Sequence, residues 1–296
     1  MKFTSKLLLG LGVAGVLAAG AAWFISAPRA FDASAFAGLE GDHKAGESVF
    51  WAAGCASCHM VEGGDPLVLA GGQAFATQFG TFHAPNVSPD PVAGIGGWTL
   101  EEFARAIQQG VSPTGAHYFP ALPYVAYAKM TPQDVANLKA YMDWLPANAT
   151  PSLPHDITFP FNIRRSLGLW KAMFVDDSYV ITGDLNAAEQ RGRYIAESLA
   201  HCGECHTPRN ALGGLDRSKW LAGAPSADGK SRVPNITPAA LDWSDGDIFA
   251  YLTTGFTPEY DSVGGHMAHV VENMAKLPES DVQAVVAYLR RVPAVP

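Results

Sequence analysis

Charged side chains are scarce in this chain. They make up 16% of its 296 residues, and 28 acidic against 20 basic residues give a formal net charge of −8. Proteins that bind nucleic acids need clustered lysines and arginines against the phosphates, so this composition excludes a nucleic-acid partner. Hydrophobic residues reach 48%, which predicts a folded, core-forming protein. The negative charge suits a partner with a basic docking patch.

Catalytic motifs are missing as well. The sequence contains no nucleophile–base set and no glycine-rich dinucleotide loop. We therefore expect that the chain is not itself an enzyme. Cysteine is also rare, because there are only four, and all four belong to one repeated motif that leaves none for a structural disulfide.

That motif is Cys-x-x-Cys-His, present twice. A single copy could be a thiol redox pair or half of a zinc site, but the copies lie 147 residues apart, too far for a zinc ribbon. The motif is the attachment signature of c-type haem, in which the thiols form thioethers and the histidine binds iron. We expect two covalently bound haem c groups, attached through Cys55, Cys58, Cys202 and Cys205 and ligated by His59 and His206.

Other landmarks recur in the same order around the two motifs. Pro-Asn-Val-Ser-Pro at 85–89 returns as Pro-Asn-Ile-Thr-Pro at 234–238, and Trp98 returns as Trp243. A repeat at nearly constant spacing indicates two copies of one domain. The expected organisation is an N-terminal signal or membrane anchor at 1–27, a first cytochrome c domain at 40–148, a linker at 149–183 and a second cytochrome c domain at 184–296.

Each copy is expected to be all-α. A first helix, at 45–53 or 187–200, leads into the motif. A middle helix begins at a capping pattern and ends at a glycine, and a last helix begins beside a proline. No alternating strand is expected. The boundary residues of the middle and last helices are Thr99, Gly110 and Pro132 in the first copy and Ser244, Gly255 and Pro278 in the second.

The stretch between the two copies, from Pro146 to Gly183, carries four prolines at 146, 151, 154 and 160, so this part is expected to run extended. Its later part is too apolar for a free linker. We expect it to clamp the two domains together, with partner docking as the alternative. The apolar residues are Phe159, Phe161, Ile163, Leu167, Leu169, Trp170 and Phe174.

The sixth iron ligand decides whether a haem relays electrons or binds substrate, and a methionine closes the site. Met130, just before the last helix of the first copy, is the expected ligand there. In the second copy Leu277 aligns with Met130, so Met267 is expected instead. The alternatives there are Met274, His266 and His269.

Four further histidines are interpreted as surface or hydrogen-bonding residues. Three arginines could bind haem propionates, because arginine holds carboxylates bidentately, or could be solvated. These residues are His83, His117, His155 and His201 among the histidines, and Arg164, Arg165 and Arg209 among the arginines.

The N-terminus has the pattern of an export signal. Lys2 and Lys6 precede an uncharged run at 7–25, which approaches the roughly 20 residues needed to span a bilayer. Trp23 lies where an interfacial aromatic would be. We expect an anchor in the inner (cytoplasmic) membrane, and a signal cleaved near 19–21 is the alternative. Either places the remainder in the periplasm.

With these residues in place, the chain resembles the cytochrome c subunits of membrane-associated bacterial alcohol, gluconate and fructose dehydrogenases. The resemblance covers nearly the whole exported part and implies two tandem class I cytochrome c-like domains, with Met130 and Met267 as distal ligands. Those subunits commonly carry a third haem domain, and this sequence shows two, which disfavours direct quinone reduction. The stretches that carry the resemblance are 52–59, 123–130, 162–170, 205–210, 234–238 and 267–273.

The expected function is that of a periplasmic cytochrome that passes electrons from a dehydrogenase subunit to the respiratory chain. A membrane-tethered shuttle between respiratory complexes is the first alternative. A dihaem enzyme of the peroxidase or thiosulfate-oxidising type is the second, and it would need an open or unusually ligated haem.

Overall fold

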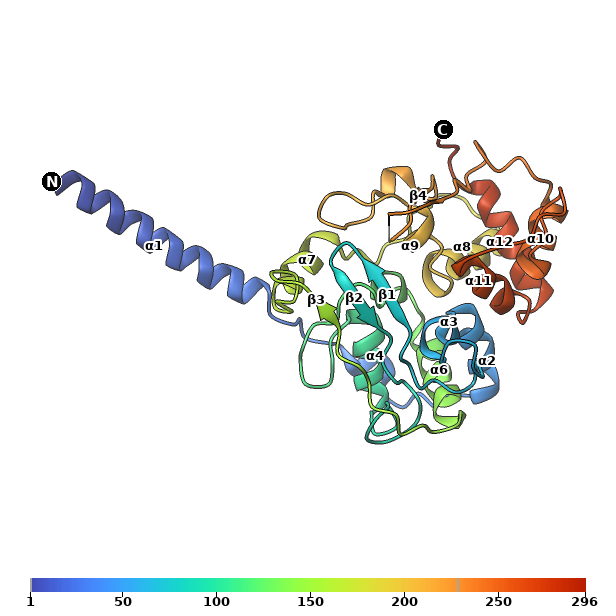
Figure 1. Ribbon diagram of the computed structural model, residues 1–296, viewed down its shortest axis with the longest axis horizontal. Coiled ribbons are helices and arrows are strands. Elements are labelled where there is room, and N and C mark those ends of the chain that lie inside the picture. The colour runs from blue at the N-terminus through green and yellow to red at the C-terminus, as the bar shows by residue number, and fades with distance from the viewer. Residues whose placement is uncertain (1, 228) are drawn as a thin grey trace.

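Helices carry most of the packing in this protein (Figure 1). The computed structural model describes residues 2–227 and 229–296, while the side chains of residues 2–5 and 7–9 lie outside this description. We call residues 40–148 the first half and residues 184–296 the second half. The helices are α1 (Lys2–Ile25), α2 (His43–Ala52), α3 (Cys55–His59), α4 (Leu100–Gln109), α5 (Tyr124–Tyr127), α6 (Pro132–Trp144), α7 (Ser166–Phe174), α8 (Ala187–Tyr194), α9 (Gly203–His206), α10 (Asp245–Thr254), α11 (His266–Met274) and α12 (Glu279–Arg291), with short helical turns η1 (Ala33–Phe36), η2 (Ile195–Leu199) and η3 (Arg217–Lys219).

The expected boundaries of the middle helices are confirmed. Thr99 caps α4 and Ser244 caps α10, each through a reciprocal capping box that satisfies free N–H groups of the first turn. Both helices end on a glycine in the left-handed conformation, Gly110 with φ 61° and Gly255 with φ 79°.

The same helix crossing occurs in both halves, α2 on α6 and α8 on α12. A glycine allows each close approach. A Cβ atom added to Gly46 would lie 2.0 Å from the carbonyl oxygen of Asn137, and one added to Gly192 would lie 1.8 Å from that of Ala284. These crossings hold the start of each motif against the core.

Two small sheets correct the all-α expectation. Strands β1 (Ala74–Thr77), β2 (Gly80–His83) and β3 (Asp156–Ile157) form one antiparallel sheet in that order, and β4 (Ala224–Pro225) pairs with β5 (Arg232–Val233). Strands of two to four residues are too short to show an alternating pattern, which is why the sequence did not reveal them. Strand β3 belongs to the connecting segment and pairs with β2. The connecting segment is therefore held against the first half by this strand pairing.

The later part of the connecting segment forms α7, which lies between the halves. The Nε1 atom of Trp170 donates to the carbonyl of Leu212 at 2.8 Å, and the Trp170 ring packs edge-on against Tyr124 with centroids 6.5 Å apart. Trp170 therefore contacts both halves, as expected of a clamp. The clamp prediction is wrong for three residues that the structure leaves exposed, Phe159, Phe161 and Ile163.

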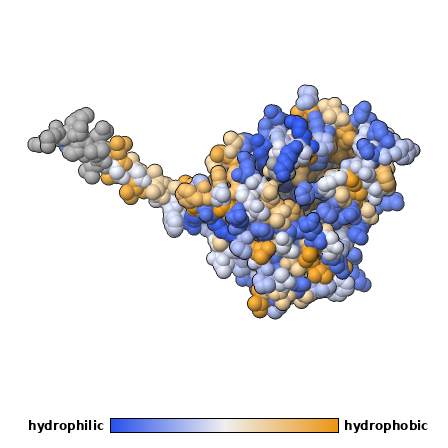
Figure 2. All heavy atoms as spheres, viewed as in Figure 1, coloured by the Kyte–Doolittle hydropathy of each residue, from blue (hydrophilic) through white to orange (hydrophobic). Residues whose placement is uncertain are grey.

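Helix α1 projects away from the remainder of the protein (Figure 1). The C-terminal end of α1 is held against the protein at Ser26, which is buried. The Ser26 carbonyl accepts from Nε2 of the buried His117 at 2.9 Å, and the Ser26 hydroxyl accepts from Nε of Arg165, just before α7, at 3.0 Å. Figure 2 shows hydrophobic residues exposed along the described length of α1.

Across residues 2–227 and 229–296, no helix combines the length and apolar character needed to cross a membrane.

Candidate functional site

Each Cys-x-x-Cys-His motif forms a short helix, α3 or α9, directly after the first helix of its half. The chain reverses direction between the two helices through a residue with positive φ. In the first half this residue is Gly54 with φ 65°, and in the second it is His201 with φ 42°. Glycine adopts this conformation freely, whereas a side chain there costs about 1–2 kcal/mol.

The motif histidines are oriented in the same way in both halves. Nδ1 of His59 donates to the carbonyl of Pro85 at 2.8 Å, and Nδ1 of His206 donates to the carbonyl of Pro234 at 2.8 Å. In each repeated Pro-Asn stretch, the carbonyl of the first proline accepts this bond. A carbonyl on Nδ1 fixes the tautomer and ring orientation of a metal-binding histidine, and leaves Nε2 for the metal.

Two further observations show that the histidines fit a haem iron. Within the described part of the chain, neither His59 nor His206 has a hydrogen-bond partner at Nε2. Burial lowers the pKa of both rings. The neutral imidazole is therefore favoured, and it is the form that binds a metal.

The motif cysteines fit thioether attachment rather than thiol redox chemistry. Desolvation raises the pKa of the Cys55 and Cys202 thiols to about 12 and that of Cys58 to about 11. The pKa of Cys205 is also raised by desolvation. A redox-active thiol needs a lowered pKa, so a thiol redox pair does not fit either motif.

The two motifs lie side by side across the contact between the halves. After desolvation, the second cause that raises the pKa of Cys58 is the charge of Cys205 in the other motif. Nδ2 of Asn273, on α11, donates to Oγ of Ser57 between the first two cysteines, at 2.8 Å. The two attachment sites are thus held together by the fold itself.

Tyr127 also connects the motifs. Its hydroxyl donates to the carbonyl of Ala53 at 2.8 Å, just before the first motif. Its ring packs edge-on against His201, which precedes the second motif, with centroids 5.6 Å apart. Tyr127 is therefore a shared element of both sites; it lies in the stretch 123–130 that carries the family resemblance, but this role was not predicted from the sequence.

The methionine candidates occupy different positions. Met130 is buried in the turn between α5 and α6, where its carbonyl accepts from Nε2 of Gln108 at 2.9 Å. Met267 is half-buried in the first turn of α11, and Met274 is fully buried on the same helix. Assignment of the distal ligands remains a proposal, given below.

The remaining histidines have protein partners. His83, His117 and His201 face backbone carbonyls, and Nδ1 of His155 accepts from the backbone of His83. His269 lies 3.1 Å from Glu272. The contacts of His83, His117, His155 and His201 agree with their interpretation as hydrogen-bonding residues, whereas His269 was an alternative distal ligand.

The three arginines considered for propionates are engaged by the protein. Arg209 pairs with Glu204, Arg165 donates to the backbone and hydroxyl near the end of α1, and Arg164 donates to the carbonyl of His117.

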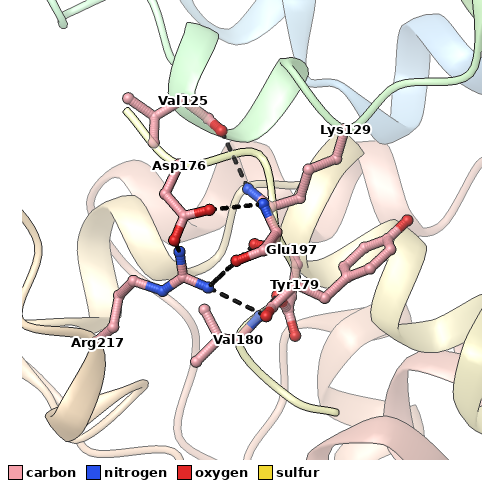
Figure 3. A network of polar contacts seen from close by, with 8 residues as sticks. Val125, Lys129, Asp176, Tyr179, Val180, Glu197 and Arg217 are labelled. Carbon is pink, nitrogen blue, oxygen red and sulfur yellow. Dashed lines mark hydrogen bonds and ion pairs between the residues drawn. The ribbon is translucent and has the colours of Figure 1, made fainter. Parts of the chain in front are cut away.

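A buried polar cluster beside the second motif was missed by the sequence reading (Figure 3). Glu197, on η2, is 1% exposed and accepts hydrogen bonds from the backbone N–H groups of Val180 and Ile181. Nearby, Arg217 pairs with Asp176. The only sequence signal was an extra residue in the helix before the second motif, which the duplication could have revealed.

Comparison with known proteins assigns the family. The family model described as Cytochrome c matches residues 43–146. A "Diheme cytochrome c-type" protein of Cereibacter sphaeroides is 53% identical over 97% of this chain and 98% of its own length. The chain therefore belongs to the c-type cytochrome family.

Relatives also include subunits of larger enzymes. The "Fructose dehydrogenase cytochrome subunit" of Gluconobacter japonicus is 44% identical over 82% of this chain and 51% of its own length. The "Gluconate 2-dehydrogenase cytochrome c subunit" of Pantoea cypripedii is 31% identical over 85% of this chain and 59% of its own length. The chain spans little more than half of these two relatives, and it is homologous to electron-transfer subunits of dehydrogenases.

Proposed function

We propose that this protein is a periplasmic electron carrier with two covalently bound haems, one in each of two tandem cytochrome c domains at 40–148 and 184–296, joined by the linker at 149–183. The observation that carries the proposal is the identical histidine geometry in the two motifs, each ring donating to a proline carbonyl at 2.8 Å. Family membership and the name of the Cereibacter relative support the same reading.

The roles of the residues follow from their positions. Cys55 and Cys58 hold one haem through thioethers, and Cys202 and Cys205 hold the other. When bound, each haem supplies an iron that accepts and releases one electron. His59 and His206 are the proximal ligands, oriented by the carbonyls that their Nδ1 atoms face.

Methionines are proposed to close the distal positions. Met130 is supported by its burial and by the hydrogen bond that holds its backbone, and Met267 by its half-buried position on α11. Met274, seven residues and about two turns further along the same helix, is the alternative in the second half. A closed site relays electrons and excludes small ligands, so no catalytic residue is required of this chain.

The partners proposed are a dehydrogenase subunit as electron donor and a respiratory component as acceptor. Homology to dehydrogenase cytochrome subunits supports the donor, and the net charge of −8 favours encounter with a basic docking patch. Export would use residues 1–27. N-terminal sequencing of the mature protein distinguishes a cleaved signal from a retained inner-membrane anchor, because a chain that begins near residue 22 would exclude the anchor.

The test is spectroscopic, on the protein purified from the membrane fraction with its haems. Intact mass should show two haems per chain, the oxidised form should show the near-infrared methionine-to-iron band, and carbon monoxide should not bind. Met130→Ala and Met267→Ala should each remove about half of the band.

Rapid binding of carbon monoxide or peroxide by the unmodified protein would instead indicate an open haem. That outcome would rule out the proposed electron-carrier function and favour a dihaem enzyme. Purification with a stoichiometric large subunit supports the dehydrogenase partner, and its absence points to a shuttle between respiratory complexes.

A further inference from the structure

The spacing between the crossing glycine and the motif is one residue longer in the second half than in the first. Gly46 and Gly192 make the same helix crossing, yet nine residues separate Gly46 from Cys55 and ten separate Gly192 from Cys202. The structure absorbs the extra residue as the π-helix η2 (Ile195–Leu199). Such bulges are rare and occur frequently at functional sites.

The bulge places a carboxylate in the core. Glu197 is 1% exposed, and beyond the two backbone N–H donors it accepts from the hydroxyl of Tyr288 at 2.9 Å. In the first half, Tyr141 is the counterpart of Tyr288, and its ring packs against Phe50 with centroids 5.1 Å apart. The second half therefore buries a carboxylate where the first half buries a phenyl ring.

A continuous set of contacts connects Glu197 to the second motif. The hydroxyl of Tyr288 accepts from Nε1 of Trp220 at 2.8 Å. The Trp220 ring lies directly on Gly203, where an added Cβ would approach ring atoms to 2.0 Å. The charge of Glu197 also contributes to the raised pKa of Cys202.

On the basis of the two-haem function proposed above, we propose that Glu197 lowers the midpoint potential of the haem held at Cys202 and Cys205 below that of the haem held at Cys55 and Cys58. A buried negative charge stabilises ferric over ferrous iron, and low polarity strengthens the effect. One electron then moves from the iron at His206, oxidised from Fe(II) to Fe(III), to the iron at His59, reduced from Fe(III) to Fe(II).

Two positively charged side chains, Arg217 and Lys129, lie in the same polar cluster as Glu197 (Figure 3). Arg217 pairs with Asp176 (Figure 3). The ammonium group of Lys129 donates to the carbonyl of Val125 at 3.0 Å and belongs to the first half, next to Met130. Burial lowers the pKa of Lys129 and the charge of Glu197 raises it, so the two groups face each other, and Lys129 offsets part of the negative charge at Glu197. Transfer from the second haem to the first places the donor dehydrogenase at the second half and the acceptor at the first.

The experiment is a spectroelectrochemical titration of the purified two-haem protein and its Glu197→Gln variant. In Glu197→Gln the ferrous-to-ferric ratio of the second haem should rise about tenfold at a fixed potential. The lower-potential wave should therefore shift upward by about 59 mV, the value for a one-electron couple. The upper wave should move less. Glu197→Asp is the matched control, because it keeps the negative charge while also disturbing the packing around this position. Its lower-potential wave should stay near that of the unmodified protein.

Glu279→Gln removes an exposed negative charge from the same half and should leave both waves in place, because water screens that position. Two haems with unchanged waves in Glu197→Gln would overturn the inference and leave the proposed function standing. A shift confined to the upper wave, or an equal shift in Glu197→Asp, would overturn it as well. A chain that carries fewer than two haems would instead refute the proposed function.

Discussion

The two halves of this protein share a motif and the histidine geometry that serves it, yet they differ in the helix that leads into the motif. In the first half this helix is regular and packs an aromatic core, with Phe50 on Tyr141. In the second half it ends in a π-helix that buries Glu197. The turn after it uses His201 at positive φ, where the first half has Gly54.

The comparison shows which structural features both halves keep around the motif and which features differ between them. The proline carbonyl opposite the histidine and the glycine at the helix crossing occur in both halves, because each satisfies a geometric demand of the motif. The residues that surround the motif are free to change, provided that each new polar group finds partners. Varying these surroundings changes the electrostatics of a site without changing its ligands.

The largest effect is expected from the glycines that the halves share. Gly46→Ala and Gly192→Ala each force a Cβ into a carbonyl of the partner helix and should destabilise the protein by about 3 kcal/mol. Denaturant unfolding measures this. Gly246→Ala is the control, because its nearest neighbour would be 3.8 Å away and helix propensity predicts a gain of up to about 1 kcal/mol.

The pair of variants also sharpens the comparison. If the halves unfold separately, each variant lowers the midpoint of a different transition. A single shared transition that both variants lower would show that the halves unfold as one unit. Equal stability of Gly46→Ala and the unmodified protein would contradict the close crossing of α2 and α6.

A smaller effect is expected from the clamp between the halves. Trp170→Ala removes a half-buried ring and its hydrogen bond to Leu212, and should cost about 2 kcal/mol, roughly half the value for a fully buried tryptophan. The two halves should then unfold with less cooperativity. Met173→Ala on the same helix is the control, since Met173 is 59% exposed. Unchanged cooperativity in Trp170→Ala would count against the clamp.

The smallest effect on stability at neutral pH is expected from Lys171. This lysine lies in the connecting segment and contacts the first half, and the described residues of the second half, 184–227 and 229–296, have no such contact with it. Nζ of Lys171 donates to the carbonyls of Gln109 and Gly110 at the end of α4, both at 2.6 Å. Burial lowers the pKa of Lys171 from 10.5 to about 7. Between these values the unfolded chain binds a proton that the folded chain does not, so this group makes stability rise with pH.

Lys171→Met should remove that rise. The stability difference between the unmodified protein and the variant is expected to grow in favour of the unmodified protein from pH 7 toward pH 10.5, as measured by urea unfolding at several pH values. Lys44→Met, at an exposed position on α2, should show no such trend. A constant difference for Lys171→Met across this range would refute the assignment.

Much of the local structure could be predicted because its causes are local. Capping boxes at Thr99 and Ser244, the terminal glycines of α4 and α10, and the proline at the start of α6 each satisfy backbone groups within one turn. The prediction of the haem-attachment residues rests on a local pattern as well, since two cysteines and a histidine at fixed spacing form the attachment signature.

Other features depended on contacts between distant segments. The short strand β3 forms only because the connecting segment returns to β2, and Phe159 and Phe161 are exposed although their composition suggested burial. Burial of a given apolar residue is decided by what packs on it, which no local pattern specifies.

The sequence by itself determined the duplicated motifs and the helices that present them, because these follow from residue type and spacing along the chain. Only the tertiary structure decided that the two motifs lie side by side, that proline carbonyls 26 and 28 residues away orient the histidines, and that Glu197 is buried beside the second site. The physical reason is that orientation, burial and electrostatic environment belong to groups that meet only when the chain has folded.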